Sequence, residues 1–218
     1  MSNHQKGYSR DRSIIASVEE QGCLDTEQIR IMHFSGLKYG RRIAQKRLLS
    51  LHKRGRVNRA RLSIGHPYYY YIGRQGRQVE HRLGVNWIRV WMVAKLETWE
   101  RMHSFEYEVD YGILRTDGFA AVKNKMTGAF KFYFVEYDNA ASGNPFDKVE
   151  KYNKLFEQQP AVWWKGLTDR FPAVIIVTTS PVRANIIRER VKQENKNGLE
   201  FRVYDIDYII GACEHEQA

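Results

Sequence analysis

The stretch FKFYFVEYD, residues 130–138, carries the strongest fold signal in this sequence. Its phenylalanines alternate with other side chains that are themselves mostly apolar, a pattern typical of a strand buried on both faces. The same alternation then places Glu136 and Asp138 on the phenylalanine face. A buried carboxylate is costly unless it is paired with a cation or binds a metal. The end of this strand is therefore a candidate site.

The segments around this strand predict an α/β (α+β) fold with a mixed sheet. Residues 105–138 read as successive strands, and NKMTG at 124–128 is a hairpin turn. The other expected elements are helices at 87–101, 146–159 and 180–195 (the last capped by Ser180), a strand at 171–180, and a last strand at 199–210 followed by a short turn.

Asp117 and Glu136 lie on opposite sides of that turn at similar distances, so we expect their side chains to meet at one edge of the sheet. Their hard oxygen ligands suit Mg²⁺ or Mn²⁺. Asp138 points the same way as Glu136, and Lys148 and Tyr152 lie four residues apart on the next helix, within reach of the same edge. We take Asp117 and Glu136 as metal ligands and add Asp138 and Lys148 to the catalytic set. A metal here would polarise a scissile phosphate and generate hydroxide, with Lys148 stabilising the developing charge. The alternative is a strand that simply reaches solvent, where its carboxylates pair with lysines.

The positive charge is concentrated in the first third of the chain. Residues 1–80 hold 16 of the 35 Lys and Arg but only 6 of the 25 Asp and Glu, a net charge of +10, which leaves 19 of each sign for the remainder. Such asymmetry indicates a polyanion-binding module joined to an electrically neutral one.

The basic region predicts three helices, at 9–21, 26–34 and 40–55, followed by a hairpin of two runs at 56–63 and 68–73. This order is that of a winged helix-turn-helix. In such a module the third helix enters the major groove of DNA, and the hairpin lies along the backbone.

In the third helix, Ala44, Leu48 and Leu51 face inward, which leaves the basic residues outside. Arginine forks onto guanine edges, glutamine reads adenine, and lysine mostly contacts phosphate. The candidate DNA-binding residues are Lys38, Tyr39, Arg41, Arg42, Gln45, Lys46, Arg59 and Arg61. His66 is a further candidate in the hairpin. The alternative is a solvated basic helix on a protein-interaction module.

Several function classes lack support. No segment approaches the roughly 20 apolar residues of a membrane helix, so we expect no membrane partner. Cys23 and Cys213 are the only cysteines, which favours a cytoplasmic protein over a disulfide framework. Walker, GxSxG and GxGxxG motifs are absent. A tyrosine nucleophile in the run at 68–71 would need the His-x-His metal pair of relaxases, which the chain lacks, so that run is better explained as an aromatic strand.

The order of several short motifs resembles the replication-relaxation family of plasmids, phages and integrative elements. The matching pieces are LLSLHKRGRVNR at 48–59, YYYYIGRQG at 68–76, HRLGVN at 81–86, TDG at 116–118, FVEYD at 134–138, KVEKY at 148–152 and FPAVIIVTTSPVRANII at 171–187. The resemblance implies a winged helix-turn-helix domain at 1–78. It also implies a restriction-endonuclease-like, PD-(D/E)XK nuclease-like domain with a mixed sheet at 79–218.

Carried onto this chain, the nuclease motif is Asp117 followed by Glu136 and Asp138 of FVEYD. The nuclease pattern has lysine where this chain has Asp138, and Lys148 on the following helix would take its place. Thr116 stands where proline is usual.

The leading hypothesis is a mobile-element protein that binds double-stranded DNA and acts in plasmid or phage replication or relaxation, with nicking that depends on Mg²⁺ or Mn²⁺. The alternative is a non-catalytic DNA-binding transcription or copy-number regulator whose second domain mediates dimerisation or protein contacts. In either case we include a homodimer and replication proteins among the expected partners.

Overall fold

The computed structural model describes residues 3–139, 145–158, 166–168 and 170–215. The chain separates into two compact units, Met1–Val90 with Cys213–Ala218, and Trp91–Ala212. Among the described residues, no helix is both long and apolar enough to cross a membrane.

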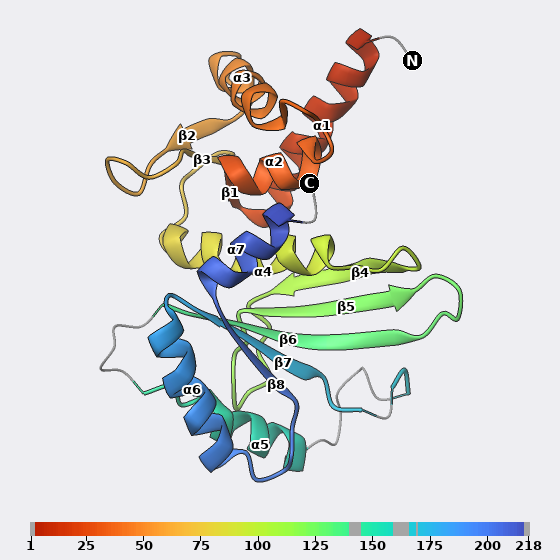
Figure 1. The fold of residues 1–218 in the computed structure, drawn as a ribbon, viewed down its shortest axis with the longest axis vertical. Coiled ribbons are helices and arrows are strands. Elements are labelled where there is room, and N and C mark those ends of the chain that lie inside the picture. The colour runs from red at the N-terminus through yellow and green to blue at the C-terminus, as the bar shows by residue number, and fades with distance from the viewer. Residues whose placement is uncertain (1–2, 140–144, 159–165, 169, 216–218) are drawn as a thin grey trace. The chain divides into compact units, whose positions relative to one another are not determined.

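The described part of the first unit contains three complete helices, the first part of a fourth, and a small antiparallel sheet (Figure 1). Its elements are α1 (Asn3–Gln21), β1 (Cys23–Asp25), α2 (Thr26–Phe34), α3 (Gly40–Lys53), β2 (Asn58–Ala60), β3 (Tyr69–Tyr71) and the first part of α4 (Val79–Ala94). The sheet has the order β1-β3-β2, so the predicted hairpin is present as β2 and β3. The three predicted helices are also present, although α1 begins earlier than expected. Strand β1 was not predicted, because three residues are too few to establish a period.

The core of the first unit is formed by all three helices and the sheet. Its buried members are Ile14, Val18, Leu24, Ile29, Phe34, Ala44, Leu48, Leu51, Val57 and Tyr70. The prediction that Ala44, Leu48 and Leu51 face inward is confirmed, since each is at most 1 % exposed. At the start of α2 the Asp25 side chain accepts a hydrogen bond from the Gln28 backbone N–H, and the Gln28 side chain accepts one from the Asp25 backbone. This reciprocal capping box sets where α2 begins.

The predicted helix at 87–101 is wrong at both ends, because α4 begins at Val79 and ends at Ala94. Tertiary contacts stabilise the helix before residue 87. Val79 and Leu83 are buried with Cys23 and Tyr69. The predicted domain division at residues 78 and 79 falls at the first residue of α4 and stays a prediction.

The second unit is built on a five-stranded sheet of order β4-β5-β6-β7-β8. Its elements are β4 (Glu100–Tyr107), β5 (Gly118–Asn124), β6 (Phe130–Asp138), α5 (Lys148–Gln158), β7 (Ala173–Thr178), α6 (Pro181–Glu194), β8 (Phe201–Asp205) and α7 (Ile206–His215). Strands β4, β5 and β6 are antiparallel, whereas β6, β7 and β8 are parallel. The predicted mixed sheet is therefore confirmed.

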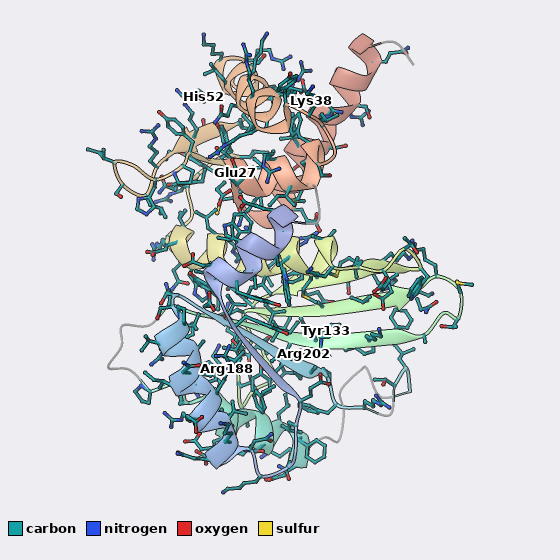
Figure 2. The ribbon with its side chains drawn as sticks, in the orientation of Figure 1. Glu27, Lys38, His52, Tyr133, Arg188 and Arg202 are labelled. Atoms are coloured by element: carbon teal, nitrogen blue, oxygen red, sulfur yellow. The ribbon has the colours of Figure 1, made fainter. Side chains whose placement is uncertain are left out.

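Strand β6 is the central strand and joins the antiparallel half of the sheet to the parallel half. On one face, Phe132 and Phe134 are buried with Val149 and Tyr152 of α5 and with Ile187 of α6. These helices therefore cover the face toward which Glu136 also points. The opposite face carries Tyr133, whose ring lies 5.7 Å from the guanidinium of Arg202 in β8 (Figure 2).

The predicted last strand at 199–210 is wrong in its second half, because β8 ends at Asp205 and α7 follows directly. The Asp205 side chain accepts a hydrogen bond from the Tyr208 backbone N–H at 2.9 Å, which caps the helix. The run of β-branched residues concealed this start. Ile209 is fully buried, so packing stabilises the helix.

Candidate functional site

Three segments distant in the sequence meet at the carboxyl end of β6. Asp117 is the residue before β5, Glu136 lies in β6, and Lys148 is the first residue of α5. Gly118 pairs with Val135, so Asp117 and Glu136 are the next positions along the same register. The predicted placement of Asp117 within a strand differs by one residue from what is observed. The expected meeting of the two carboxylates is nevertheless what the register produces.

Glu136 is buried, with 1 % of its surface exposed. Its Oε1 accepts a hydrogen bond from the Tyr152 hydroxyl at 2.5 Å, and its Oε2 accepts one from the Lys148 ammonium. Burial raises the pKa of Glu136 to about 8, although the Lys148 ammonium acts to lower it; the Asp117 carboxylate raises it further. This side chain is consequently poised to gain or lose a proton near neutral pH.

Lys148 contacts both carboxylates. Its Nζ lies 3.7 Å from Asp117 Oδ1, in addition to its hydrogen bond to Glu136. Burial acts to lower the pKa of Lys148, but the carboxylates of Glu136 and Asp117 outweigh it and hold that pKa above its usual value. The ammonium therefore stays charged and is the positive charge that the buried carboxylates require.

The TDG motif positions Asp117 through its neighbours. The Thr116 backbone N–H donates to the carbonyl of Val109 at 2.9 Å, a bond that proline at this position would not make. The Asp117 carboxylate accepts a hydrogen bond from the Tyr137 backbone N–H at 2.7 Å. Both bonds tie the segment before β5 to its surroundings and orient the carboxylate toward Lys148.

Asp138 takes part in a different set of contacts from Glu136. Its carboxylate accepts two hydrogen bonds from the Arg183 guanidinium, at 2.6 and 3.2 Å, and one from the Thr178 hydroxyl at 3.4 Å. Arg183 lies at the start of α6, where Ser180 caps the helix as expected. The side chains of Asp138 and Arg183 are only 9 % and 6 % exposed. This ion pair links β6 to α6.

Other acidic residues near the site are engaged elsewhere. Glu108 pairs with Arg115, and Asp110 accepts a hydrogen bond from the Gly112 backbone N–H. Within the described part of the chain, no group of three or more His, Cys, Asp or Glu residues is arranged to hold a metal ion. Asp117 and Glu136 alone would not complete the coordination of a cation here, so backbone carbonyls or oxygens from outside the chain would supply the remaining ligands.

The predicted DNA-binding residues of α3 and of the turn before it are exposed. Lys38, labelled in Figure 2, and Tyr39 lie in the turn between α2 and α3. The Lys38 ammonium lies 5.7 Å from the Tyr39 ring centroid. On α3 the exposed residues of the candidate set are Arg41, Arg42, Gln45 and Lys46. Arg41 also contacts Glu27 at 3.0 Å, yet its side chain remains 73 % exposed. The set thus forms one accessible surface of the first unit.

The predicted hairpin residues are held by an aromatic ring. The guanidinium groups of Arg59 and Arg61 lie 4.3 and 3.9 Å from the centroid of Tyr68. Two other tyrosines of the run, Tyr69 and Tyr70, are buried, at 2 % and 3 % exposure. Packing therefore accounts for the middle of the run, as the strand interpretation expects.

The sequence did not reveal which basic residues already have partners. Arg47 and Arg54 both bind the buried Asp11 carboxylate. In the second unit, Arg183 forms an ion pair with Asp138. No sequence signal distinguishes these arginines from exposed ones, because each partner is more than 35 residues away along the chain.

Comparisons with known proteins add little to this description. No protein-family model matches the chain, and no curated protein matches it. Among solved structures, the chain is similar to restriction endonuclease FokI bound to DNA, with a TM-score of 0.36 and 12 % sequence identity. The match covers 99 % of this chain but only 46 % of the other, so the chain spans less than half of that protein. A likeness this loose supports no inference about activity.

Proposed function

We propose that the protein binds double-stranded DNA through its first unit and cuts one DNA strand at a metal-dependent site in its second unit. The proposed nuclease activity rests on one observation, the cluster of Asp117, buried Glu136 and Lys148. Three segments of the chain bring these residues together at the end of the central strand. Two carboxylates with a lysine at a sheet edge are the functional groups of a PD-(D/E)XK-type site, with Lys148 supplied from α5.

The donor chemistry of the site fits Mg²⁺ or Mn²⁺. Mg²⁺ commonly binds through one or two carboxylates together with substrate phosphates, so Asp117 and Glu136 would hold it when DNA is present. The metal would supply Lewis-acid polarisation of the phosphate and an activated water. Tyr152 fixes the orientation of Glu136, and Lys148 stabilises negative charge that develops on the phosphate.

For the first unit, the element order and the small sheet support a winged helix-turn-helix, with α3 as the recognition helix and β2 and β3 as the wing. The exposed cations of α3 and the net charge of the first 80 residues support a polyanionic ligand. The resemblance to the replication-relaxation family suggests that this activity serves replication or relaxation of mobile DNA, with a homodimer or replication proteins as further partners.

The decisive assay is the nicking of supercoiled plasmid in Mg²⁺ or Mn²⁺. Wild type should convert supercoiled plasmid to the open-circular form, and Glu136→Gln should abolish the conversion while band shifts on duplex DNA remain. Lys148→Met should also be inactive. Matched controls are Glu150→Gln and Lys154→Met on the exposed side of α5, where the two residues pair with each other. Nicking that persists in Glu136→Gln would refute the proposal that Glu136 belongs to the catalytic site.

DNA binding is tested separately by its salt dependence. About five phosphate contacts should give a slope near −4.5 in log K against log salt concentration. Binding that is independent of salt would contradict the winged-helix proposal.

One observation favours a second candidate, a non-catalytic regulator. Lys148 already contacts Glu136 Oε2, and the described residues offer no third acidic ligand. In a regulator, replacing Asp117 and Glu136 together would leave DNA binding intact, and wild type would not nick plasmid of any topology. The plasmid assay distinguishes the two candidates.

A further inference from the structure

The loop that joins β2 and β3 presents an apolar tip to solvent. Ile64 is 99 % exposed and Leu62 is 42 % exposed. The loop extends away from the three-stranded sheet (Figure 1). An isoleucine that is fully exposed contributes nothing to the core of its own chain, whereas its burial against a ligand is favourable.

The tip is ordered by its own hydrogen bonds. The Ser63 hydroxyl and the His66 ring nitrogen Nδ1 lie 2.6 Å apart, and the His66 backbone N–H donates to the Ser63 carbonyl at 3.2 Å. Gly65 between them has a φ of +95°, a backbone angle that residues other than glycine rarely adopt. Ile64 is thus held at the end of a closed turn, so that little conformational freedom remains to be lost on binding.

The hairpin that carries the tip is basic. Residues 56–73 contain three arginines and no Asp or Glu. Arg59 and Arg61 are both stacked on Tyr68, which places two guanidinium groups on the hairpin itself. An apolar tip flanked by fixed cations is suited to a ligand that has a polyanionic surface and an apolar interior.

We propose that Ile64, assisted by Leu62, is a wedge that enters the minor groove of bound duplex DNA and partly unstacks one base step, so that the DNA bends. The proposal rests on DNA binding by the first unit and adds to it. Proteins that bend DNA from the minor groove insert isoleucine or leucine between base pairs in this way, while cations bind the flanking phosphates. The favoured target is a flexible pyrimidine–purine step such as TA, which unstacks most easily.

Duplex DNA is the ligand that these features fit best. The two side chains are too small to form a protein interface, which buries roughly 1,200 Å² or more. A base step, by contrast, accepts a single apolar side chain, and the phosphates on either side match the two arginines.

The test uses the full chain and short duplexes that carry 2-aminopurine next to a TA step, with a fluorophore pair at the ends. At low salt, where binding needs no particular site, wild type should raise the 2-aminopurine fluorescence and shorten the end-to-end distance. Ile64→Ala should lose both signals and bind about tenfold more weakly, with an unchanged salt slope because no charge is removed. Ile64→Leu should retain both signals.

The matched control is Met126→Ala in the turn between β5 and β6, where another apolar side chain is 83 % exposed. It should behave as wild type. Bound DNA that stays straight and stacked, or that bends equally with Ile64→Ala, would overturn the wedge while leaving DNA binding in place. The absence of any band shift would instead overturn the DNA-binding proposal itself.

Discussion

Replacing Asp138 by alanine tests whether this carboxylate stabilises the folded state or takes part in DNA cleavage. The ion pair with Arg183 is bidentate, and its two side chains are 9 % and 6 % exposed. Removing one partner of such a pair leaves the other charge buried without compensation, which costs about 3–5 kcal/mol. In a chain of this size each kcal/mol lowers Tm by about 2–4 °C, so the expected drop is about 6–20 °C.

The assay is thermal and urea unfolding followed by circular dichroism. A matched control is Glu189→Ala, which removes the exposed pair with Lys192 in α6 and should cost less than about 1 kcal/mol. The double variant Asp138→Ala with Arg183→Met removes both buried charges and should recover much of the lost stability. A loss below about 1 kcal/mol in Asp138→Ala, or no recovery in the double variant, would refute this reasoning. Nicking by Asp138→Ala well below its Tm would show that the carboxylate acts through the fold alone.

Three further predictions concern the site. Burial raises the pKa of Glu136 to about 8, so the folded state favours the protonated carboxyl. This preference stabilises the folded state fully below the unfolded-state pKa, and the stabilisation is lost as the pH rises toward 8. The expected loss of unfolding free energy is on the order of a few kcal/mol. Urea unfolding between pH 5 and 8 should show this decline in metal-free wild type and not in Glu136→Gln; parallel curves would contradict it. Tyr152→Phe removes a hydrogen bond that lowers the pKa of Glu136, so the pH of half-maximal nicking should rise; an unchanged pH profile would argue against the contact. Gly118→Ala would place a Cβ 2.8 Å from the ring of Phe105 and should cost about 1–3 kcal/mol of unfolding free energy by overpacking, whereas a neutral result would mean that the ring moves aside freely.

Local patterns in the sequence were sufficient for several elements. The period of two identified β6, the capping residue Ser180 located α6, and the spacing of apolar residues in α3 correctly predicted which face of that helix is buried. The similar distances of Asp117 and Glu136 from one hairpin turn were enough to predict that they lie at the same edge of the sheet. These features depend on neighbours along the chain or across a single hairpin, and such short-range geometry is encoded directly in residue spacing.

Tertiary structure decided the features that depend on distant partners. The extent of α4 depends on burial against Cys23 and Tyr69, which outweighs its glycine and polar residues. The different partners of Glu136 and Asp138 also depend on residues that are distant in the sequence. Both lie on one strand face, yet one binds Lys148 and the other Arg183. The sequence by itself determined that charged groups end the central strand. Which cation meets each carboxylate follows from the packing of α5 and α6, because a buried charge is stable only beside the partner that the fold brings to it.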